Sequence, residues 1–350
     1  MTPSLAHKPF IVPVFIPHAG CPHRCIFCDQ TRTTSQAERV PTADELDETI
    51  RRFLSYRNDP GRYTEISYYG GNFLGLTEDR IMALLAHAAQ YVARGEVNGI
   101  RFSTRPDTID QRRLHLLERF PVTTVELGVQ SMNNKVLATV LRGHTAQDAR
   151  HAAALLKKTP YRLGAQMMLG LPGDSVQSAL ATGAAIRGLA PDFVRIYPTL
   201  VLKGSVLARW HGQDRYTPLR LEEAVDLAKT LYALFMRSDI RVVRMGLQAT
   251  DGLDLGEDLV DGPYHPAFGE LVHSAQWLSA LRKGIDALHF RGSELEIRLN
   301  PRLVSRVKGQ RNKNMQTLTR EYTLSKIHLI TDQDLSMDQI LLNGQPCPFL

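Results

Sequence analysis

The chain has 350 residues, 43% of them hydrophobic and 22% charged, with a formal net charge of +6 and an isoelectric point near 9.2. This composition excludes a wholly disordered or fibrous chain and allows one large domain with a sizeable core. The modest positive charge permits contact with an anionic partner such as nucleic acid, but it does not require one.

Short strand-like runs alternate with amphipathic helical stretches from residue 10 to about residue 200. The predicted strands are 11–16, 64–69, 99–104, 123–130, 162–169 and 192–199. The predicted helices between them are 43–57, 78–93, 109–119, 146–157 and 176–189. This alternation is typical of βαβ units, and therefore of a parallel sheet with right-handed crossovers.

Polar residues recur on one face of these strands, and this pattern favours a barrel over a doubly wound sheet. In the fourth strand Val125, Leu127 and Val129 share one face, while Glu126 and Gln130 share the other. A strand covered by apolar layers on both faces would consist almost entirely of Val, Ile and Leu. We therefore predict a partial (β/α)6 barrel of the TIM type, with an interior suited to ligand binding.

The pattern changes after residue 200, where the spacing of the elements becomes irregular. The remaining predicted elements are a helix over 219–237, a strand over 240–248 that continues or edges the barrel, an extended loop over 251–268, a helix over 266–282 and a strand over 294–299. We expect two domains, a barrel over residues 1–250 and a small appended α+β region over residues 251–350.

Three of the four cysteines, Cys21, Cys25 and Cys28, fall within eight residues, and the fourth is Cys347. Clustered thiols indicate a metal site in a reducing compartment rather than a disulfide framework. The apolar stretch at 11–16 is too short for an ordinary secretory segment, and no run approaches the roughly 18 apolar residues that a membrane span needs. We expect a cytoplasmic protein with no membrane partner, and we interpret Cys347 as an incidental thiol near a mobile terminus.

The segment PHAGCPHRCIFCDQ at 17–30 places the three clustered cysteines in a loop after the first strand, at the end of a barrel where active sites lie. Thiolates suit both iron–sulfur clusters and zinc. An ordinary [4Fe–4S] cluster takes four cysteines, so three would leave one iron open for chemistry. The alternative is structural zinc with His18 or His23 as fourth ligand, but closed zinc knuckles usually bring ligands in two pairs, and no second pair is present.

The C-x3-C-x2-C spacing, with Phe27 just before the last cysteine, resembles the signature of the radical S-adenosylmethionine superfamily. The resemblance implies that Cys21, Cys25 and Cys28 hold a [4Fe–4S] cluster whose open iron binds S-adenosylmethionine. It also implies reductive cleavage of that cofactor to a 5′-deoxyadenosyl radical, with electrons from a donor such as flavodoxin or ferredoxin.

Motifs at the ends of the later strands support this resemblance: YYGGN (68–72), STRPD (103–107), VELGVQS (125–131), LRGHT (141–145) and AQMMLGLPGD (165–174). The first is similar to the glycine motif whose backbone receives the methionine amine, and paired glycines allow such a close approach. Arg142 suits a carboxylate because its planar guanidinium binds one bidentately. The cofactor contacts that the resemblance implies are Phe27, Gly70, Gly71, Asn72, Ser103, Gln130, Arg142 and Gln166.

Together these motifs resemble a subset of radical enzymes that includes anaerobic coproporphyrinogen dehydrogenase and the catalytic subunit of Elongator. VRIYPTLVLKGSVL at 194–207 and GPYHPAFGELV at 262–272 are closer to the Elongator subunit. The gap between the first two cysteines is shorter than in that subunit, and no sequence remains for its acetyltransferase domain. We therefore expect only the radical step to be shared. Tyr197 and Lys203, near the end of the sixth strand, are candidates to face substrate.

Residues 298 to 320 contain seven basic residues and no acidic one. Such uncompensated charge is the footprint expected for a phosphate backbone, and a solvated basic surface is the alternative. Polar Asn312, Asn314 and Gln316 alternate with the charges and are candidates to contact bases or sugars. The candidate RNA contacts are Arg298, Arg302, Arg306, Lys308, Arg311 and Lys313, with Arg320 completing the basic set.

The leading hypothesis is a radical enzyme that acts on an RNA base, in tRNA. The second is a small-molecule oxidoreductase similar to coproporphyrinogen dehydrogenase. The third is a non-catalytic binding module stabilised by zinc or by a cluster.

Overall fold

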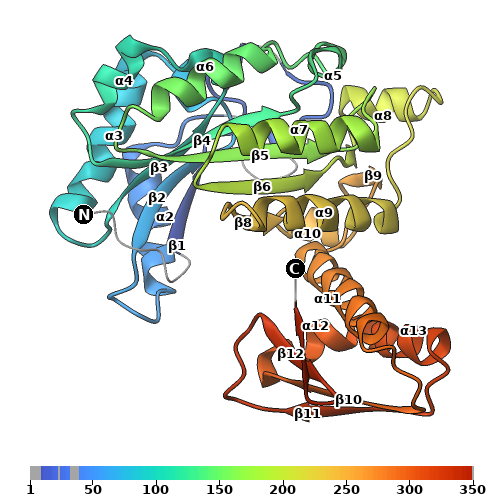
Figure 1. The fold of residues 1–350 in the computed structure, drawn as a ribbon. Coiled ribbons are helices and arrows are strands. Elements are labelled where there is room, and N and C mark those ends of the chain that lie inside the picture. The colour runs from blue at the N-terminus through green and yellow to red at the C-terminus, as the bar shows by residue number, and fades with distance from the viewer. Residues whose placement is uncertain (1–8, 23, 32–38, 349–350) are drawn as a thin grey trace.

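The computed structural model describes residues 9–22, 24–31 and 39–348 as two units joined through one long helix (Figure 1). The larger unit is a curled sheet of seven parallel strands in the order β1-β2-β3-β4-β5-β6-β8. These strands are β1 (Phe10–Phe15), β2 (Thr64–Tyr69), β3 (Gly99–Thr104), β4 (Val122–Gln130), β5 (Arg162–Leu169), β6 (Phe193–Pro198) and β8 (Arg241–Met245). The predicted partial barrel is confirmed, and the strand expected over 240–248 adds a seventh strand at its edge.

Helices cover the outer face of this sheet (Figure 1). They are α2 (Ala43–Ser55), α3 (Glu78–Ala93), α4 (Gln111–Leu117), α6 (Ala146–Leu156), α7 (Val176–Gly188) and α9 (Leu221–Met236). Local sequence fixes where several of them begin. Thr42 caps α2 by accepting from the Glu45 backbone N–H, while the Glu45 carboxylate accepts from the Thr42 N–H in a capping box. Thr145 and Asp148 start α6 in the same way.

The two faces of the strands divide as the alternation predicts. Val125, Leu127 and Val129 on β4 are fully buried in the main hydrophobic core. Glu126 and Gln130 on the same strand make polar contacts with side chains from other strands of the sheet. The sheet therefore packs its apolar face against the helices and directs polar groups into the half-barrel.

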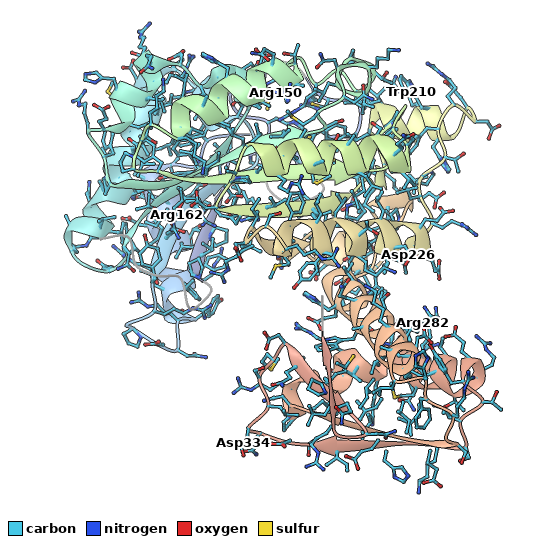
Figure 2. The ribbon with its side chains drawn as sticks, viewed as in Figure 1. Arg150, Arg162, Trp210, Asp226, Arg282 and Asp334 are labelled. Carbon is cyan, nitrogen blue, oxygen red and sulfur yellow. The ribbon has the colours of Figure 1, made fainter. Side chains whose placement is uncertain are left out.

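Short elements extend the carboxyl ends of the strands, where Figure 1 places α5, α8 and β9. They are α5 (Asn134–Thr139), α8 (Val206–His211), α10 (Asp251–Asp254) and an antiparallel ribbon of β7 (Val201–Leu202) with β9 (Leu259–Asp261). The segment expected to be an extended loop over 251–268 therefore contains a helical turn and a strand, because β9 pairs with β7. In Figure 2, Arg162 and Trp210 mark opposite ends of the half-barrel, Arg162 at the start of β5 and Trp210 on α8.

The smaller unit is a mixed sheet in the order β11-β10-β12-β13, covered by helices. Its elements are α11 (Phe268–Ala287), β10 (Glu294–Leu299), α12 (Val304–Lys308), α13 (Lys313–Glu321), β11 (Lys326–Thr331), β12 (Gln339–Leu342) and β13 (Gln345–Pro348). The predicted appended α+β region is confirmed. Because α11 contacts α9 and β8 as well as α12, α13 and β13, the division expected near residue 250 stays a prediction.

Cys347 on β13 belongs to the core of this smaller unit. Its side chain is 2% exposed, and its thiol donates to the Ala280 carbonyl at 3.2 Å. The sulfur also packs against Gly284, where an added Cβ would come within 2.6 Å of it. The interpretation of Cys347 as an incidental terminal thiol was therefore wrong. Among the described helices, none combines the length and the apolar character needed to cross a bilayer.

Candidate functional site

The three clustered cysteines lie in the loop after β1, at the carboxyl end of the barrel. Cys25 is 6% exposed, and Cys21 and Cys28 are partly buried. Burial raises the pKa of Cys21, and burial together with the neighbouring Cys25 and Cys21 raises the pKa of Cys28. Since the thiolate is the metal-binding form, a metal bound here must displace protons from these thiols.

A reciprocal pair of hydrogen bonds closes the cysteine loop at its two ends. The His18 backbone N–H donates to Gln30 Oε1 at 2.6 Å, and the Gln30 backbone N–H donates to His18 Nε2 at 3.0 Å. Gln30 Oε1 also accepts from the Gly71 N–H at 2.6 Å, which ties the loop to the segment after β2. The predicted motifs gave Gln30 no role, because its partners lie far from it along the chain.

Glycines allow the cysteine loop and the YYGGN segment to pack backbone against backbone. A Cβ on Gly20 would lie 2.2 Å from the Asn72 carbonyl oxygen, and one on Gly71 would lie 2.3 Å from that of Ala19. The Asn72 N–H donates to the same Ala19 oxygen at 2.7 Å. Gly20 and Gly71 are thus required by this close approach, whatever ligand binds beside them.

Asn72, a predicted cofactor contact, is completely buried and joins three segments of the scaffold. Its Nδ2 donates to the Gly20 carbonyl at 3.1 Å. Its Oδ1 accepts from Thr104 Oγ1 at 2.7 Å and from the Arg105 N–H at 3.0 Å. Both polar atoms of the amide therefore hold the cysteine loop against the end of β3.

Arg142 connects the cysteine loop to β4. Its Nη1 lies 3.5 Å from Cys25 Sγ, and its Nη2 donates to the Gly128 carbonyl at 2.7 Å. Its Nε is buried and has no hydrogen-bond partner within the described residues. A Cβ at position 128 would lie 2.8 Å from Nη2, so a larger residue there would displace the guanidinium. Gln166 on β5 donates to Gln130 Oε1 at 3.3 Å, which brings two further predicted residues together.

The other predicted residues lie in varied surroundings. Phe27 packs partly buried in a hydrophobic cluster that includes Met168. Ser103 is partly buried near the end of β3. Tyr197 on β6 accepts from Arg195 Nη1 at 3.1 Å and so belongs to the barrel interior. Lys203 is exposed in the turn after β7.

Arg105 and His144 are buried residues of the predicted motifs that were given no role. Arg105 is 2% exposed and forms a bidentate pair with Asp107, both contacts being 2.9 Å long. His144 is 4% exposed with Nε2 at 3.1 Å from the Val129 carbonyl, and burial lowers its pKa to about 3. Its buried Nδ1 has no partner in the described part of the chain. The signal in the sequence was their place in polar motifs, with Arg105 just after β3 and His144 between α5 and α6.

The barrel interior beneath this site is charged and internally paired. Glu126 Oε2 contacts Arg195 Nε at 2.7 Å, and Arg195 Nη2 donates to Tyr69 Oη at 2.5 Å. One layer nearer the amino ends of the strands, Glu65 contacts Arg101 at 3.0 Å and Arg162 at 2.7 Å. Charges in these buried surroundings are tolerated because each contacts an opposite charge.

A structural zinc ion and a [4Fe–4S] cluster require different spacings of the cysteine sulfurs. In the described residues, no three His, Cys, Asp or Glu side chains converge to hold one metal ion. Thiolates on a single zinc, at about 2.3 Å from it, would lie roughly 3.8 Å apart. A [4Fe–4S] cluster instead binds each cysteine at a separate iron. His18 Nε2 is already occupied as an acceptor, and His23 lies outside the described residues.

Comparisons with known proteins agree with this geometry. Residues 15–183 match the Radical SAM superfamily, and residues 191–277 match the Radical_SAM C-terminal domain. A tRNA uridine(34) acetyltransferase of Methanocaldococcus infernus is 26% identical over 330 residues, which cover 81% of this chain and 60% of that protein. One of Dehalococcoides mccartyi is 28% identical over 230 residues, which cover 57% of this chain and 50% of that protein.

A solved structure has the same overall architecture. The archaeal Methanocaldococcus infernus Elp3 with an N-terminal deletion superposes with a TM-score of 0.59 at 20% identity, covering 79% of this chain and 64% of that one. This likeness concerns the fold. The chain spans less than two thirds of the length of each of these relatives. With three cysteines in the loop after β1, a half-barrel and both superfamily matches, the chain belongs to the radical SAM superfamily of enzymes.

Proposed function

We propose that this enzyme binds a [4Fe–4S] cluster on Cys21, Cys25 and Cys28 together with S-adenosylmethionine, and that it acts on a base of tRNA in the cytoplasm. When bound, these groups supply reductive cleavage of S-adenosylmethionine to a hydrogen-abstracting 5′-deoxyadenosyl radical, with electrons from a flavodoxin- or ferredoxin-type donor. The observation that carries the proposal is the set of three thiols beside a buried arginine whose Nε has no partner among the described residues.

The residues present fit this cofactor pair. Three soft thiol ligands leave one iron of a [4Fe–4S] cluster without a protein ligand. Arg142 approaches Cys25 while its buried Nε remains without a partner in the described part of the chain, so it has a donor to offer a carboxylate. Gln130 and Gln166 add amide groups from adjacent strands for the ribose or adenine. The loop also buries much of the thiols, which limits access of water to the site.

Support for an RNA substrate comes from two independent features. The relatives of Methanocaldococcus infernus and Dehalococcoides mccartyi are named as tRNA uridine(34) acetyltransferases, although this chain covers only part of them. The smaller unit also carries the basic segment 298–320, of which Arg302, Lys308 and Arg311 are exposed. Exposed, uncompensated cations attract a phosphate backbone.

The test is anaerobic reconstitution with iron and sulfide, followed by dithionite, S-adenosylmethionine and total tRNA. We expect 5′-deoxyadenosine to rise strongly when tRNA is present and to return to its basal level after ribonuclease treatment. A parallel reaction replaces tRNA with coproporphyrinogen. Turnover with the porphyrinogen and none with tRNA would refute the RNA substrate, while a reconstituted protein that never releases 5′-deoxyadenosine would refute the radical chemistry itself.

A further inference from the structure

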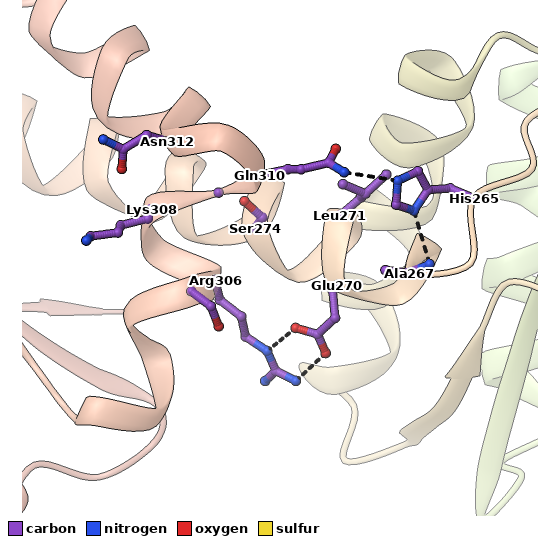
Figure 3. Close-up of a pocket in the computed structure, with 11 residues that line it drawn as sticks. His265, Ala267, Glu270, Leu271, Ser274, Arg306, Lys308, Gln310 and Asn312 are labelled. Atoms are coloured by element: carbon purple, nitrogen blue, oxygen red, sulfur yellow. Dashed lines mark hydrogen bonds and ion pairs between the residues drawn. The ribbon is translucent and has the colours of Figure 1, made fainter.

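A cavity of about 330 Å³ lies where the loop before α11 meets the corner between α12 and α13 (Figure 3). We call it the corner pocket. Its polar side chains come from both sides of that meeting point. They are His265, Glu270, Arg306, Lys308, Gln310 and Asn312, together with the hydroxyl groups of Ser274 and Ser305. None of them takes part in the cysteine site, which lies in the half-barrel.

One wall of the corner pocket is a neutral pair. Arg306 contacts the Glu270 carboxylate through Nε and Nη2, each at 2.7 Å. The bond to Arg306 is the largest cause that lowers the pKa of Glu270, so both groups are charged at neutral pH and cancel. Arg306 was predicted as a cation free to contact RNA. In the structure Arg306 forms an ion pair with Glu270, and Arg298 similarly contacts Glu296 at 3.4 Å.

The opposite wall of the corner pocket is a hydrogen-bonded pair of His265 and Gln310. His265 Nδ1 accepts from the Ala267 N–H at 3.0 Å, so a neutral His265 carries its proton on Nε2. That nitrogen lies 3.3 Å from Gln310 Nε2, so two hydrogen-bond donors, the His265 N–H and the Gln310 NH₂, would face each other. Exchanging the amide oxygen and nitrogen of Gln310 resolves the conflict, and such an exchange is a matter of assignment. The Gln310 oxygen then accepts from the His265 Nε2–H.

The corner gathers positive charge at the cavity rim. Lys308, Arg311 and Lys313 are exposed within six residues, and none has an acidic partner among the described residues. The turn is tight because Gly309, Arg311 and Asn312 adopt left-handed backbone conformations, with φ of 72°, 51° and 66°. For Arg311 and Asn312 this conformation is uncommon and costly, and such strain tends to persist at functional sites.

Asn314 fixes the corner from beneath. It was a candidate to contact bases or sugars, yet it is 5% exposed, and its Nδ2 donates to the Ser274 carbonyl and to the Val307 carbonyl at 3.0 and 3.1 Å. A Cβ on Gly309 would lie 2.9 Å from the side chains of Asn314 and Ser274. The corner is therefore a packed structure that presents its cations in a defined place.

We propose that the rim of the corner pocket receives one backbone phosphate of the RNA strand, held by Lys308 and by the amide group of Asn312, whose side chains point to the same side, away from His265 (Figure 3). This inference rests on the proposed function and deepens it. A phosphodiester suits the site better than a free phosphate because Arg311 and Lys313 continue the charge outside the cavity, where further phosphates of a strand would lie. The loop that carries His265 follows β9, and β9 pairs with β7 beside the end of β6, so the same segment borders the barrel mouth.

The test is tRNA affinity as a function of salt, measured by fluorescence anisotropy on the full chain. Lys308→Ala removes one phosphate contact, so we expect the slope of log affinity against log salt to fall by about 1. The corresponding loss of affinity at 0.1 M salt is roughly eightfold. Lys326→Ala is the matched control, since Lys326 is an exposed lysine on β11 of the same unit, and we expect no change for it.

A second variant should move affinity in the opposite direction. Glu270→Gln removes the carboxylate that neutralises Arg306, so we expect tighter tRNA binding and a slope increased by about 1. Loss of folding cannot produce such a gain.

Three results would overturn the proposal. One is a Lys308→Ala protein that binds tRNA with the wild-type affinity and slope. Another is a Glu270→Gln protein, with a wild-type melting temperature, that does not bind more tightly. The third is Lys308-dependent binding of inorganic phosphate without any effect on tRNA. Wild-type release of 5′-deoxyadenosine that still depends on tRNA would show in each case that the proposed function survives. A wild-type chain that neither binds tRNA nor responds to it would refute both.

Discussion

The half-barrel interior and the corner between α12 and α13 differ in whether their charged side chains have partners of opposite charge. Inside the barrel, Glu126 and Arg195 are largely removed from water and contact each other at 2.7 Å. At the corner, Lys308 and Arg311 stand in solvent without a described acidic partner. Buried charges need partners because desolvation is costly, whereas exposed cations are solvated and stay available to an external anion.

The difference separates two kinds of function. The charges of the interior network are paired within the protein, so they fix the positions of the strands that carry them. The corner is unsatisfied, so it is suited to attracting a ligand. Substitutions inside the barrel should therefore change stability and cofactor retention, and substitutions at the corner should change affinity and its salt dependence.

The largest effect is expected from Cys21→Ala, Cys25→Ala or Cys28→Ala. Each change removes one of three thiols, and we expect reconstituted iron to fall from about four atoms per chain to less than one, with complete loss of 5′-deoxyadenosine. Iron analysis and chromatography measure the two quantities. Cys347→Ala is the control, because that thiol lies in the core of the other unit, and it should retain the full iron content. Wild-type iron in any of the three variants would contradict the ligand assignment.

The next effect sharpens the comparison within the barrel. Glu126→Gln leaves Arg195 and Arg101 without the carboxylate that both contact, at 2.7 and 3.5 Å. Breaking a buried pair in this way costs about 3–5 kcal/mol of unfolding free energy. Urea unfolding of the apoprotein measures it. Glu223→Gln, which breaks an exposed pair with Arg220, should cost far less, because solvent screens that pair. Equal losses of unfolding free energy in the two variants would show that ion pairs inside the barrel contribute no more to stability than ion pairs on the surface.

A third prediction concerns the closure of the cysteine loop. Gln30→Ala removes the acceptor shared by the backbone N–H groups of His18 and Gly71. An unsatisfied donor that is largely removed from water costs about 1–3 kcal/mol, so the loop should open more often. We expect the reconstituted cluster to lose iron to a chelator several times faster than in the wild type. Gln90→Ala, an exposed change on α3, is the control. An unchanged rate of iron loss would show that these hydrogen bonds do not position the loop.

The sequence was sufficient to predict the half-barrel and to single out the candidate metal ligands, because both follow from local patterns. Alternation along β4 assigned Leu127 to one face and Glu126 to the other. The structure accordingly places Leu127 in the apolar core and Glu126 in the interior network. The three cysteines follow from spacing alone, and their role as cluster ligands stays a prediction.

What the sequence did not reveal depends on contacts between distant segments. Gln30 reaches Gly71 across 41 residues, and Arg306 contacts Glu270 across 36. Without knowledge of those contacts, nothing in the sequence marks Gln30 as a structural residue, and Arg306 has no evident acidic partner. Cys347 was misjudged for the same reason, since β13 pairs with β12 and packs on α11 only in the folded chain. A run of charges in the sequence therefore does not show which of its residues are paired with an acidic partner in the fold.

The smallest expected effect tests the helix that joins the two regions. His273 on α11 packs perpendicular to the Tyr232 ring on α9, with centroids 5.0 Å apart. Burial, aided by Arg306, lowers the pKa of His273 to about 4, whereas an unfolded histidine titrates near 6.5. As pH falls from about 6.5 to about 4, His273 therefore binds a proton in the unfolded chain but stays neutral in the folded chain. Stability contributed by neutral His273 is complete above that window and is lost within it.

We expect the loss of unfolding free energy between pH 7.5 and pH 5 to be smaller in His273→Phe than in the wild type, by on the order of 1–2 kcal/mol. Phenylalanine keeps the ring contact with Tyr232 but cannot be protonated. Urea unfolding of the apoprotein at the two pH values measures the difference, and carboxylates such as Glu270 titrate in both proteins and largely cancel. Identical pH dependence in the two proteins would mean that the α9–α11 contact opens enough to solvate His273. In that case α11 would be a hinge between the barrel and the corner pocket rather than a rigid connection.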